Sequence, residues 1–460
     1  MRRIAVLALL VLSSGCLGAL DTDQADAPDD LAEEPIREAQ LSPGDRSASE
    51  VAVATDPTNP AHVVAAANSD TSEEDGFGVY ETTDAGQTWN ATSYTADEVR
   101  QPPEGPSFEA ISDPVPAFGP EGTLYLAGLT VLPTSAIFVA ESPDGDQVFE
   151  ETHIVHESDV ASEFNDKEWL GVNPRTGTLH VAWQQEPALD QLRQLEQEAG
   201  VDADIGEIVH SRSTDGGDSW TDPRVVSRGM QSNGTQIAFT AEKAHMIWVN
   251  YDANTIDHVT STDDGETWSD PEPIAPVATV APYERYQRMH TLPALAADET
   301  GSDVYAVWHD SAHGDADVLA AASPDAGETW TDPVRVHDDE PGNGVIQFYP
   351  WATVDPDGNL HVTWYDARHN PQEPTFAYHH ALAEGPALNF TPTGPVSNET
   401  FTPFAGDEQG NGTVTLGDYT GVAASEAGVF PAWADARENR AQVFGARVAG
   451  EGAHRGERIE

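Results

Sequence analysis

Short stretches of alternating hydrophobic and polar residues, each interrupted by a polar turn, recur along the whole chain. The clearest copies read WATVDPDGNLHVTW at 351–364 and WLGVNPRTGTLHVAW at 169–183. Alternation with a period of two residues is typical of β-strands, and an Asp-Pro or Asn-Pro step followed by Gly favours a tight turn. Each copy therefore predicts a hairpin of two strands.

Seven such hairpins can be aligned on their turns, with spacings of 54 to 70 residues. The copies lie at 51–67, 115–128, 169–183, 237–249, 294–308, 351–364 and 421–433. A period of this length, filled with short strands and Gly/Pro turns, is typical of a β-propeller, in which each repeat forms one four-stranded antiparallel blade. We predict an all-β propeller of seven blades, with six blades as the alternative if one copy is not a true blade.

A second phrase follows four of these hairpins. It reads TTDAGQTW at 82–89, STDGGDSW at 213–220, STDDGETW at 261–268 and SPDAGETW at 323–330. The Asp carboxylate can accept hydrogen bonds from nearby backbone amides, Gly takes a positive φ, and the Trp can pack on its own blade. The phrase thus predicts the turn between the third and fourth strands, built on Asp84, Gly86, Trp89, Asp215, Gly217, Trp220, Asp263, Gly265, Trp268, Asp325, Gly327 and Trp330.

This S/T-x-D-x-G-x-T/S-W phrase resembles the Asp box of sialidase-like (BNR-repeat) β-propellers, and the resemblance covers about residues 46–450. A degraded fifth copy is SPDGDQVF at 142–149, and a sixth lies near 381–390. The last unit keeps only QVFGARV (442–448) as a third strand, so the segment before Ser49 is expected to close the ring. The resemblance places the Asp boxes on the face opposite the channel mouth, where they serve as scaffold.

The resemblance also implies where a site would lie: in the loops after the second strand and before the first strand of each blade, around the channel mouth. A sialidase needs an arginine clamp for the sugar carboxylate, a tyrosine nucleophile paired with a glutamate, and an aspartate as acid and base. The candidates in these loops are Arg288, Arg368 and Arg437 for the clamp, Tyr349 or Tyr419 with Glu168 for the nucleophile, and Asp366 or Asp310 for the acid.

A structural interpretation competes with this catalytic one. Asp-Ala-Arg occurs at 366–368 and again at 435–437, and a repeated pair of this kind indicates an ion pair between blades. The Arg-Ile-Pro stretch that carries the first clamp arginine of sialidases is also missing from the sequence. Three hypotheses follow: a module that binds a glycan or an envelope protein at the channel mouth, a sialidase-type glycosidase, and a structural component of the cell envelope.

The net charge indicates the conditions in which this protein works. The 460 residues include 79 acidic and 21 basic ones, a net charge of −58, and the only lysines are Lys167 and Lys243. Acidic residues spread over the whole chain repel one another unless salt screens their charges, and this distribution is typical of proteins that work in molar salt. Nucleic acid is excluded as a partner because no basic stripe exists. No nucleotide-binding, zinc or Ser-His-Asp motif is present, so we expect no cofactor and no metal, and a monomer.

The N-terminus predicts export. Arg2 and Arg3 precede the apolar run 4–12 and then SSGC, which indicates a signal peptide over 1–15. The only cysteine, Cys16, resembles the lipidated residue of a lipobox, so we expect a lipid anchor on the outer face of the cytoplasmic membrane. An acidic tether is expected over 16–45 and a polar tail over 451–460. The sequons at Asn90, Asn233, Asn389, Asn398 and Asn411 agree weakly with an exported chain.

Overall fold

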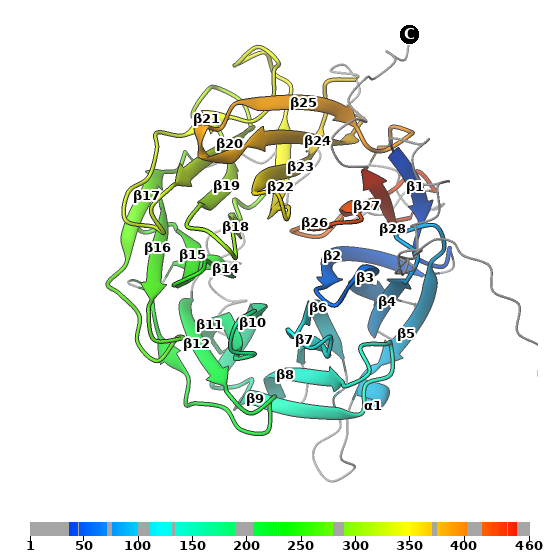
Figure 1. Ribbon diagram of the computed structural model, residues 1–460, viewed down its shortest axis with the longest axis vertical. Coiled ribbons are helices and arrows are strands. Elements are labelled where there is room, and N and C mark those ends of the chain that lie inside the picture. The colour runs from blue at the N-terminus through cyan, green and yellow to red at the C-terminus, as the bar shows by residue number, and fades with distance from the viewer. Residues whose placement is uncertain are drawn as a thin grey trace, which may run out of the picture. The chain divides into compact units, whose positions relative to one another are not determined.

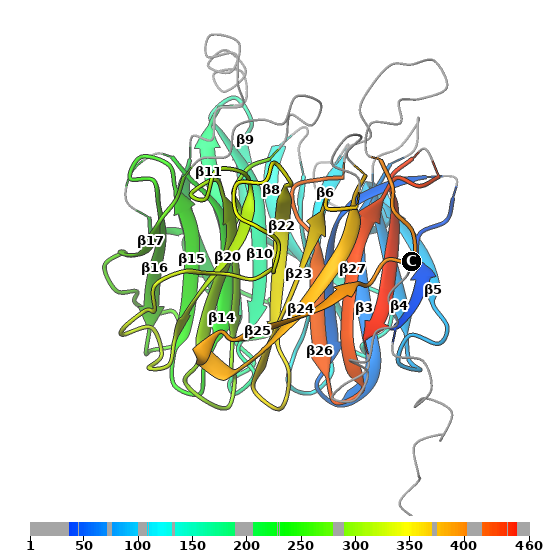
Figure 2. The same ribbon diagram turned by 90° about the horizontal axis from the view of Figure 1, so that it is seen from above.

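A computed structural model describes residues 36–448, apart from 45, 71–75, 100–107, 109, 131–133, 189–205, 228, 230, 279–288, 370–374, 403–415 and 439. Its strands form seven four-stranded antiparallel sheets arranged in a ring (Figures 1 and 2). The predicted seven-bladed propeller is confirmed, and the six-bladed alternative is wrong. None of the described helices combines the length and the hydropathy needed to cross a membrane. The predicted signal peptide, Cys16 and the C-terminal tail lie outside the described residues.

The blades follow one another along the chain, each from its innermost to its outermost strand. Blade 1 is β2 (Ser47–Asp56), β3 (Asn59–Asp70), β4 (Gly76–Thr82) and β5 (Asn90–Thr95). Blade 2 is β6 (Ile111–Phe118), β7 (Leu124–Thr130), β8 (Thr134–Ser142) and β9 (Glu151–Asp159). Blade 3 is β10 (Glu163–Val172), β11 (Leu179–Pro187), β12 (Glu207–Ser213) and β13 (Arg224–Val225). Blade 4 is β14 (Ser232–Phe239), β15 (Ala244–Asn250), β16 (Thr255–Ser261) and β17 (Glu272–Pro276).

The remaining blades repeat the arrangement. Blade 5 is β18 (Ala294–Ala297), β19 (Val304–Asp310), β20 (Asp317–Ser323) and β21 (Val334–Arg335). Blade 6 is β22 (Gln347–Val354), β23 (Asn359–Asp366), β24 (Ala377–Glu384) and β25 (Phe390–Pro395). Blade 7 is β26 (Gly421–Ser425), β27 (Gly428–Asp435), β28 (Gln442–Val448) and β1 (Ile36–Gln40). Two short helical turns, α1 (Ala96–Val99) and η2 (Gly385–Ala387), lie outside the sheets.

The ring is closed by the first strand of the chain. β1 pairs antiparallel with β28, from Ile36 opposite Val448 to Gln40 opposite Phe444. The N-terminal segment therefore supplies the outermost strand that blade 7 lacks, as the sequence predicted. This strand lies within 16–45, the segment expected to be a tether, so the propeller begins at least as early as Ile36.

The second strand of five blades carries a fully buried tryptophan near its end: Trp183, Trp248, Trp308, Trp364 and Trp433. These are the aromatic residues that end the predicted hairpins. A tryptophan of this kind removes on the order of 200 Å² from water. At about 25 cal/mol per Å² this gives at most about 5 kcal/mol each, since extended-chain areas are upper bounds. The cores between blades are therefore built on the same position of successive repeats.

The Asp boxes form the predicted turns between third and fourth strands. In the box of blade 4, Asp263 accepts hydrogen bonds from the Ser261 hydroxyl at 2.8 Å and from the Thr267 amide at 2.8 Å and hydroxyl at 2.6 Å. The Ser261 hydroxyl in turn accepts the Gly265 amide at 2.8 Å. The same bonds occur in the boxes of blades 1, 3 and 5. Side chains thus satisfy a turn whose backbone would otherwise lack partners.

The box of blade 4 also binds the preceding blade. Asp264 accepts hydrogen bonds from Asn173 at 2.6 Å and Thr178 at 2.5 Å, both near the first turn of blade 3, and contacts His180 at 3.3 Å. Trp268 donates to His210 of blade 3 at 3.2 Å. The recurring phrase therefore fastens one blade to the next as well as closing its own turn.

Candidate functional site

Five of the seven innermost strands begin with a β-bulge whose first residue has a positive φ. These residues are Glu50 (57°), Asp113 (59°), Lys167 (53°), Gly234 (65°) and Tyr349 (48°). For a residue other than glycine, this left-handed conformation costs roughly 1–2 kcal/mol. Strain of this kind persists only where surrounding contacts impose it, and it concentrates at functional sites. The starts of the innermost strands, at the predicted channel mouth, are therefore the first place to look for a site.

Lys167 is the centre of a cluster of carboxylates that come from blades 1, 2 and 3 and from the segment before blade 7. Its Nζ lies 3.1 Å from Asp418, 3.4 Å from Asp113, 3.8 Å from Asp166 and 3.9 Å from Glu50. Burial acts to lower the pKa of Lys167, but the four carboxylates outweigh it and hold the pKa well above its usual value. The lysine is therefore charged at all working pH values and joins the strands that meet at the mouth.

A hydrogen-bond network around Asn68 fixes two of these carboxylates, Glu50 and Asp113. The Asn68 amide donates to Glu50 at 2.6 Å and to Asp113 at 3.0 Å, and its oxygen accepts the Asp113 backbone amide at 2.7 Å. Burial acts to raise the pKa of Asp113, yet Lys167, Asn68 and Ser112 bring it below its usual value. Asp113 is thus held as an anion in a fixed orientation.

Glu168 and Tyr419 are the two buried groups of this cluster whose polar atoms have no hydrogen-bond partner. Glu168 is 2% exposed and Tyr419 6% exposed. Neither carboxyl oxygen of Glu168, nor the Tyr419 hydroxyl, has a partner. Burial first, and then Asp113, raises the pKa of both groups well above the usual values, and Glu168 adds to the effect on Tyr419. Burial therefore favours the neutral form of both groups, and their polar atoms retain unused hydrogen-bonding capacity, which is costly in a protein interior.

Three aromatic rings adjoin the cluster and lie across the channel. Trp169 of β10 and Trp351 of β22 have ring centroids 5.0 Å apart, although their strands lie on opposite sides of the ring in Figure 1. Tyr419 lies 5.7 Å from Trp351 and 6.2 Å from Trp169. The rings form a floor beneath the mouth cluster, which consists of Glu50, Asp113, Asp166, Lys167, Glu168, Asp418 and Tyr419.

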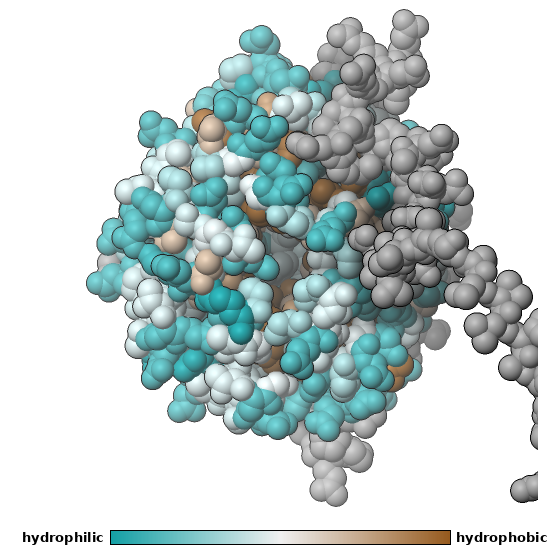
Figure 3. All heavy atoms as spheres, viewed as in Figure 1, coloured by the Kyte–Doolittle hydropathy of each residue, from teal (hydrophilic) through white to brown (hydrophobic). Residues whose placement is uncertain are grey.

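On the other side of this floor the channel widens into a cavity of about 610 Å³. Its lining combines Trp169 and apolar residues of all seven innermost strands with the turns that follow them, including Asp56, Asp298 and Asp355. Figure 3 shows hydrophobic residues within the central opening of a largely hydrophilic face. The partnerless Glu168 and Tyr419 lie in the mouth cluster and not in the lining of this cavity, so we look for a specific site at the mouth.

The predicted arginines that the structure describes have a different environment. Arg368 pairs with Asp366 at 2.9 Å and with Asp338, which follows β21 of blade 5, at 2.7 Å. Arg437 pairs with Asp435 at 2.6 Å and with Glu38 of β1 at 2.7 Å. None of these carboxylates belongs to an innermost strand. Arg368 thus joins blade 6 to the end of blade 5, in line with the structural interpretation, whereas both ion pairs of Arg437 lie within blade 7. Arg288 lies outside the described residues.

The predicted acids belong to a repeated structural contact. Asp310 and Asp366 each accept the indole N–H of the tryptophan two residues earlier, at 3.2 and 3.0 Å. Each also accepts the backbone amide two residues later, at 2.9 Å. Burial acts to raise the pKa of Asp366, but His379 and Arg368 bring it below the usual value, which does not suit a proton donor.

The last candidate, Tyr349, is packed within blade 6. It occupies the bulge of β22, where its ring is 5.0 Å from Phe348 and 5.7 Å from His309. Among the candidates described, the structure therefore brings together Glu168 and Tyr419, and leaves Tyr349, Arg368, Arg437, Asp310 and Asp366 in other contacts.

Sequence reasoning passed over Lys167, Glu50, Asp113 and Asn68. Lys167 was recognisable, because it is one of two lysines and directly precedes Glu168 at the start of an innermost strand. Glu50 and Asp113 also stand at the beginnings of innermost strands. Asn68 lies near the end of a second strand, and nothing in its surroundings in the sequence distinguishes it.

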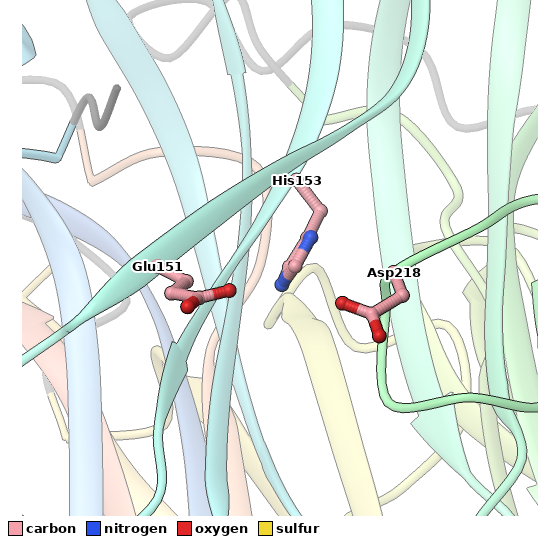
Figure 4. A group of neighbouring side chains, drawn as sticks. All are labelled: Glu151, His153 and Asp218. Atoms are coloured by element: carbon pink, nitrogen blue, oxygen red, sulfur yellow. The ribbon is translucent and has the colours of Figure 1, made fainter. Parts of the chain in front are cut away.

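Two further groups of side chains have the composition of a metal site. Glu151 and His153 of β9 and Asp218 of the blade 3 Asp box bring their ligand atoms within 4.8 Å of one another (Figure 4). Asp317, His337 and Asp339 do the same, but Arg335 already pairs with Asp317 at 2.9 Å and with Asp339 at 2.8 Å. The first group could hold a divalent cation between blades 2 and 3, while in the second the guanidinium supplies the positive charge.

No family model matches this chain, and no curated protein matches it either. Similar solved structures include sialidases and other propeller glycosidases. The NanB sialidase from Streptococcus pneumoniae is 9% identical, with 85% of this chain and 84% of that chain covered and a TM-score of 0.45. An α-L-arabinofuranosidase from Fusarium graminearum is 12% identical, with 72% and 92% covered and a TM-score of 0.46. A protein of unknown function from Dyadobacter fermentans is 13% identical, with 72% and 95% covered and a TM-score of 0.45. At these scores the similarity says nothing about individual residues.

Proposed function

We propose that this propeller is a glycan-binding module that holds its ligand at the channel mouth, against the floor of Trp169, Trp351 and Tyr419, and does not hydrolyse it. The observation that carries the proposal is the pair of buried, partnerless groups, Glu168 and Tyr419, beside an aromatic floor. A concave site with aromatic surface and a few convergent polar groups suits a sugar. A protein partner would need a broad surface of about 800 Å² on each side.

Sialidase-type hydrolysis is the second candidate, and it is favoured by one observation: a buried tyrosine lies in the same cluster as a buried glutamate. Two features weigh against it. The pKa of Glu168 is raised well above its usual value, chiefly by burial, which disfavours the ionised form that would activate Tyr419 as a base. Arg368 is already paired with Asp366 and Asp338, and Arg437 is already paired with Asp435 and Glu38. We therefore expect binding without turnover.

One experiment separates the two functions. Residues 21–460 are kept in molar KCl, incubated with a fluorogenic α-sialoside and neutral glycosides, and titrated in parallel with cationic, neutral and anionic oligosaccharides by calorimetry. We expect no release, and binding of at least one oligosaccharide that is lost in Tyr419→Phe. The matched control is Tyr80→Phe, which removes another buried, partnerless hydroxyl, in β4 of blade 1, and should bind normally. Release from the sialoside that disappears in Tyr419→Phe would instead establish a hydrolase.

We further propose that the module is exported and anchored to the outer face of the membrane through lipidated Cys16, and that it works in molar salt. The proposals rest on the N-terminal apolar run, the single cysteine and the net charge of −58. Mass spectrometry of the full-length protein purified from membranes should show an N-terminal diacylglyceryl cysteine. A mature chain that retains residues 1–15, or an unmodified Cys16, would refute the anchor.

A further inference from the structure

We propose that the channel mouth recognises a sugar that bears a free ammonium group, an amino sugar, with the ammonium placed between Glu168 and the ring floor of Trp169, Trp351 and Tyr419. This inference rests on the proposed glycan-binding function and adds the chemical class of the ligand. It distinguishes this protein from propellers that select anionic sugars. Those bind the sugar carboxylate with positively charged arginines, whereas the groups at this mouth are mostly carboxyl groups.

The first support is the bonding capacity of Glu168. Both of its carboxyl oxygens lack partners, although the side chain is 2% exposed. A carboxylate is an acceptor of hydrogen bonds and a counter-ion for a cation. Its neighbour in the chain, Lys167, does not fill this role, because its Nζ is directed to Asp418 and Asp113 at 3.1 and 3.4 Å. A ligand that supplies both a positive charge and several N–H donors satisfies Glu168 fully.

The second support is the balance of charge around Glu168. Asp113 and Asp166 both raise the pKa of Glu168, and Lys167 lowers it less than Asp113 raises it. At Glu168 the effects of Asp113 and Asp166 are each larger than that of Lys167, so the field of these charged groups at Glu168 is negative on balance. A sugar carboxylate entering this field would be repelled, whereas an ammonium would be attracted and would let Glu168 ionise.

The third support is the aromatic floor. Three rings lie within 5.0–6.2 Å of one another directly beside these carboxyl groups. An ammonium is attracted to the faces of tryptophan and tyrosine, and aromatic rings combined with acidic groups are a recurring arrangement for recognising organic cations. The same rings offer apolar surface to the C–H face of a sugar. The cavity on the other side of the floor does not offer this combination, since none of the described carboxyl groups in its lining is buried without a partner.

The test compares three oligosaccharides of equal length by titration calorimetry in molar KCl: a glucosamine oligomer, its fully N-acetylated form, and a sialylated oligosaccharide. We expect the glucosamine oligomer to bind at least about tenfold more tightly than the acetylated one, and the sialylated one not to bind. Binding should release up to one proton, measured as a difference between buffers of unlike ionisation enthalpy, because Glu168 changes from neutral to ionised.

Glu168→Gln supplies the decisive variant, since glutamine matches the neutral acid in size and should leave the fold intact. It should abolish both the preference for the free amine and the proton release. Tyr80→Phe should change neither. Equal or tighter binding of the acetylated oligomer would overturn the ammonium inference while leaving the binding function standing. Failure of all three sugars to bind a protein shown to be folded by circular dichroism would overturn the glycan-binding function itself, and the inference with it.

Discussion

The Lys167 ammonium of blade 3 lies 3.1 Å from the Asp418 carboxylate, which directly precedes blade 7. The contact crosses the channel mouth and joins segments that are far apart in the chain. Because Lys167 also lies within 4.0 Å of Asp113, Asp166 and Glu50, one side chain compensates the charge of strands from several blades. Mouth geometry and ring stability are therefore coupled through this residue.

Replacing Lys167 with methionine should destabilise the propeller by about 3–5 kcal/mol, because removal of one partner leaves buried charge uncompensated. The loss should grow as pH rises and more of the carboxyl groups ionise. Urea unfolding followed by tryptophan fluorescence, in molar KCl, measures it. The other lysine provides the control: Lys243 pairs with Glu328 at the surface, so Lys243→Met should cost about 1 kcal/mol or less. Equal losses in the two variants would contradict the coupling.

Stability should fall in mild acid because of buried histidine pairs. His180 contacts His210 at 3.1 Å and His245 contacts His258 at 3.2 Å. Burial lowers the pKa of all four, that of His258 to about 3, with help from the neighbouring cations or histidines. Below about pH 6.5 these histidines are protonated in the unfolded chain but stay neutral in the native state. The free energy of unfolding is therefore full above about pH 6.5 and decreases as the pH falls toward 3. The slope is about 1.4 kcal/mol per pH unit for each histidine.

Urea midpoints measured between pH 7.5 and 4.5 test this pH dependence. His258→Gln removes one of the buried titrating groups. It should reduce the slope of stability against pH by up to about 1.4 kcal/mol per pH unit, the contribution of one histidine. His313→Gln changes a histidine whose side chain is 42% exposed and should leave the slope as it is. An unchanged slope in His258→Gln would mean that the pair is not the source of the acid sensitivity.

The contact between Asp264 and blade 3 should contribute more to the free energy of unfolding than an ordinary turn residue does. Burial acts to raise the pKa of Asp264, but hydrogen bonds from His180, Thr178, Asn173 and Thr176 bring it well below the usual value. Asp264→Asn keeps a residue that tolerates the positive φ of 57° and removes the charge, so we expect a loss of about 2 kcal/mol. Asp357→Asn, at an exposed turn, is the control and should be neutral. The melting temperature of each variant measures the loss. Equal melting temperatures in the two variants would show that the box does not hold the blades together.

Arg437 should control closure of the ring, and Arg368 should not. Arg437 joins Asp435 to Glu38 of β1 and lies 4.1 Å above the Phe444 ring. Hydrogen exchange in Arg437→Ala should increase at Ile36–Gln40, because the outermost strand of blade 7 loses this link. Arg368→Ala removes the corresponding arginine of blade 6, which has no contact with β1, and should leave that strand protected. Protection of β1 in both variants would indicate that backbone pairing alone closes the ring.

Much of the fold was predictable because its causes are local. Asp263, Gly265 and Thr267 form a turn whose hydrogen bonds lie within eight consecutive residues, so the phrase 261–268 identifies the turn without knowledge of the rest of the chain. The alternation of hydrophobic and polar residues before Trp364 likewise predicts strands. The repeat of both signals predicted blades, and the incomplete last unit predicted that the segment before Ser49 would complete it, which Ile36–Gln40 does.

The site was predictable only in part. Glu168 and Tyr419 could be selected as members of the loops at the mouth, but so could Arg368 and Arg437, which form ion pairs with other carboxylates instead. The direction of a side chain at a β-bulge depends on φ values and on neighbouring blades, as at Lys167, and a local pattern does not contain this information.

The sequence by itself determined a closed ring of four-stranded blades, because strand alternation and turn chemistry act over a few residues and repeat seven times. Only the tertiary structure decided which polar groups meet at the axis. Lys167 and Glu168 belong to blade 3, Asp113 to blade 2 and Tyr419 to the segment before blade 7, and their charges and burial depend on distances set by closing the ring. Electrostatic and desolvation effects act through space between residues remote in the chain, so the chemistry of the mouth exists only once the propeller has formed.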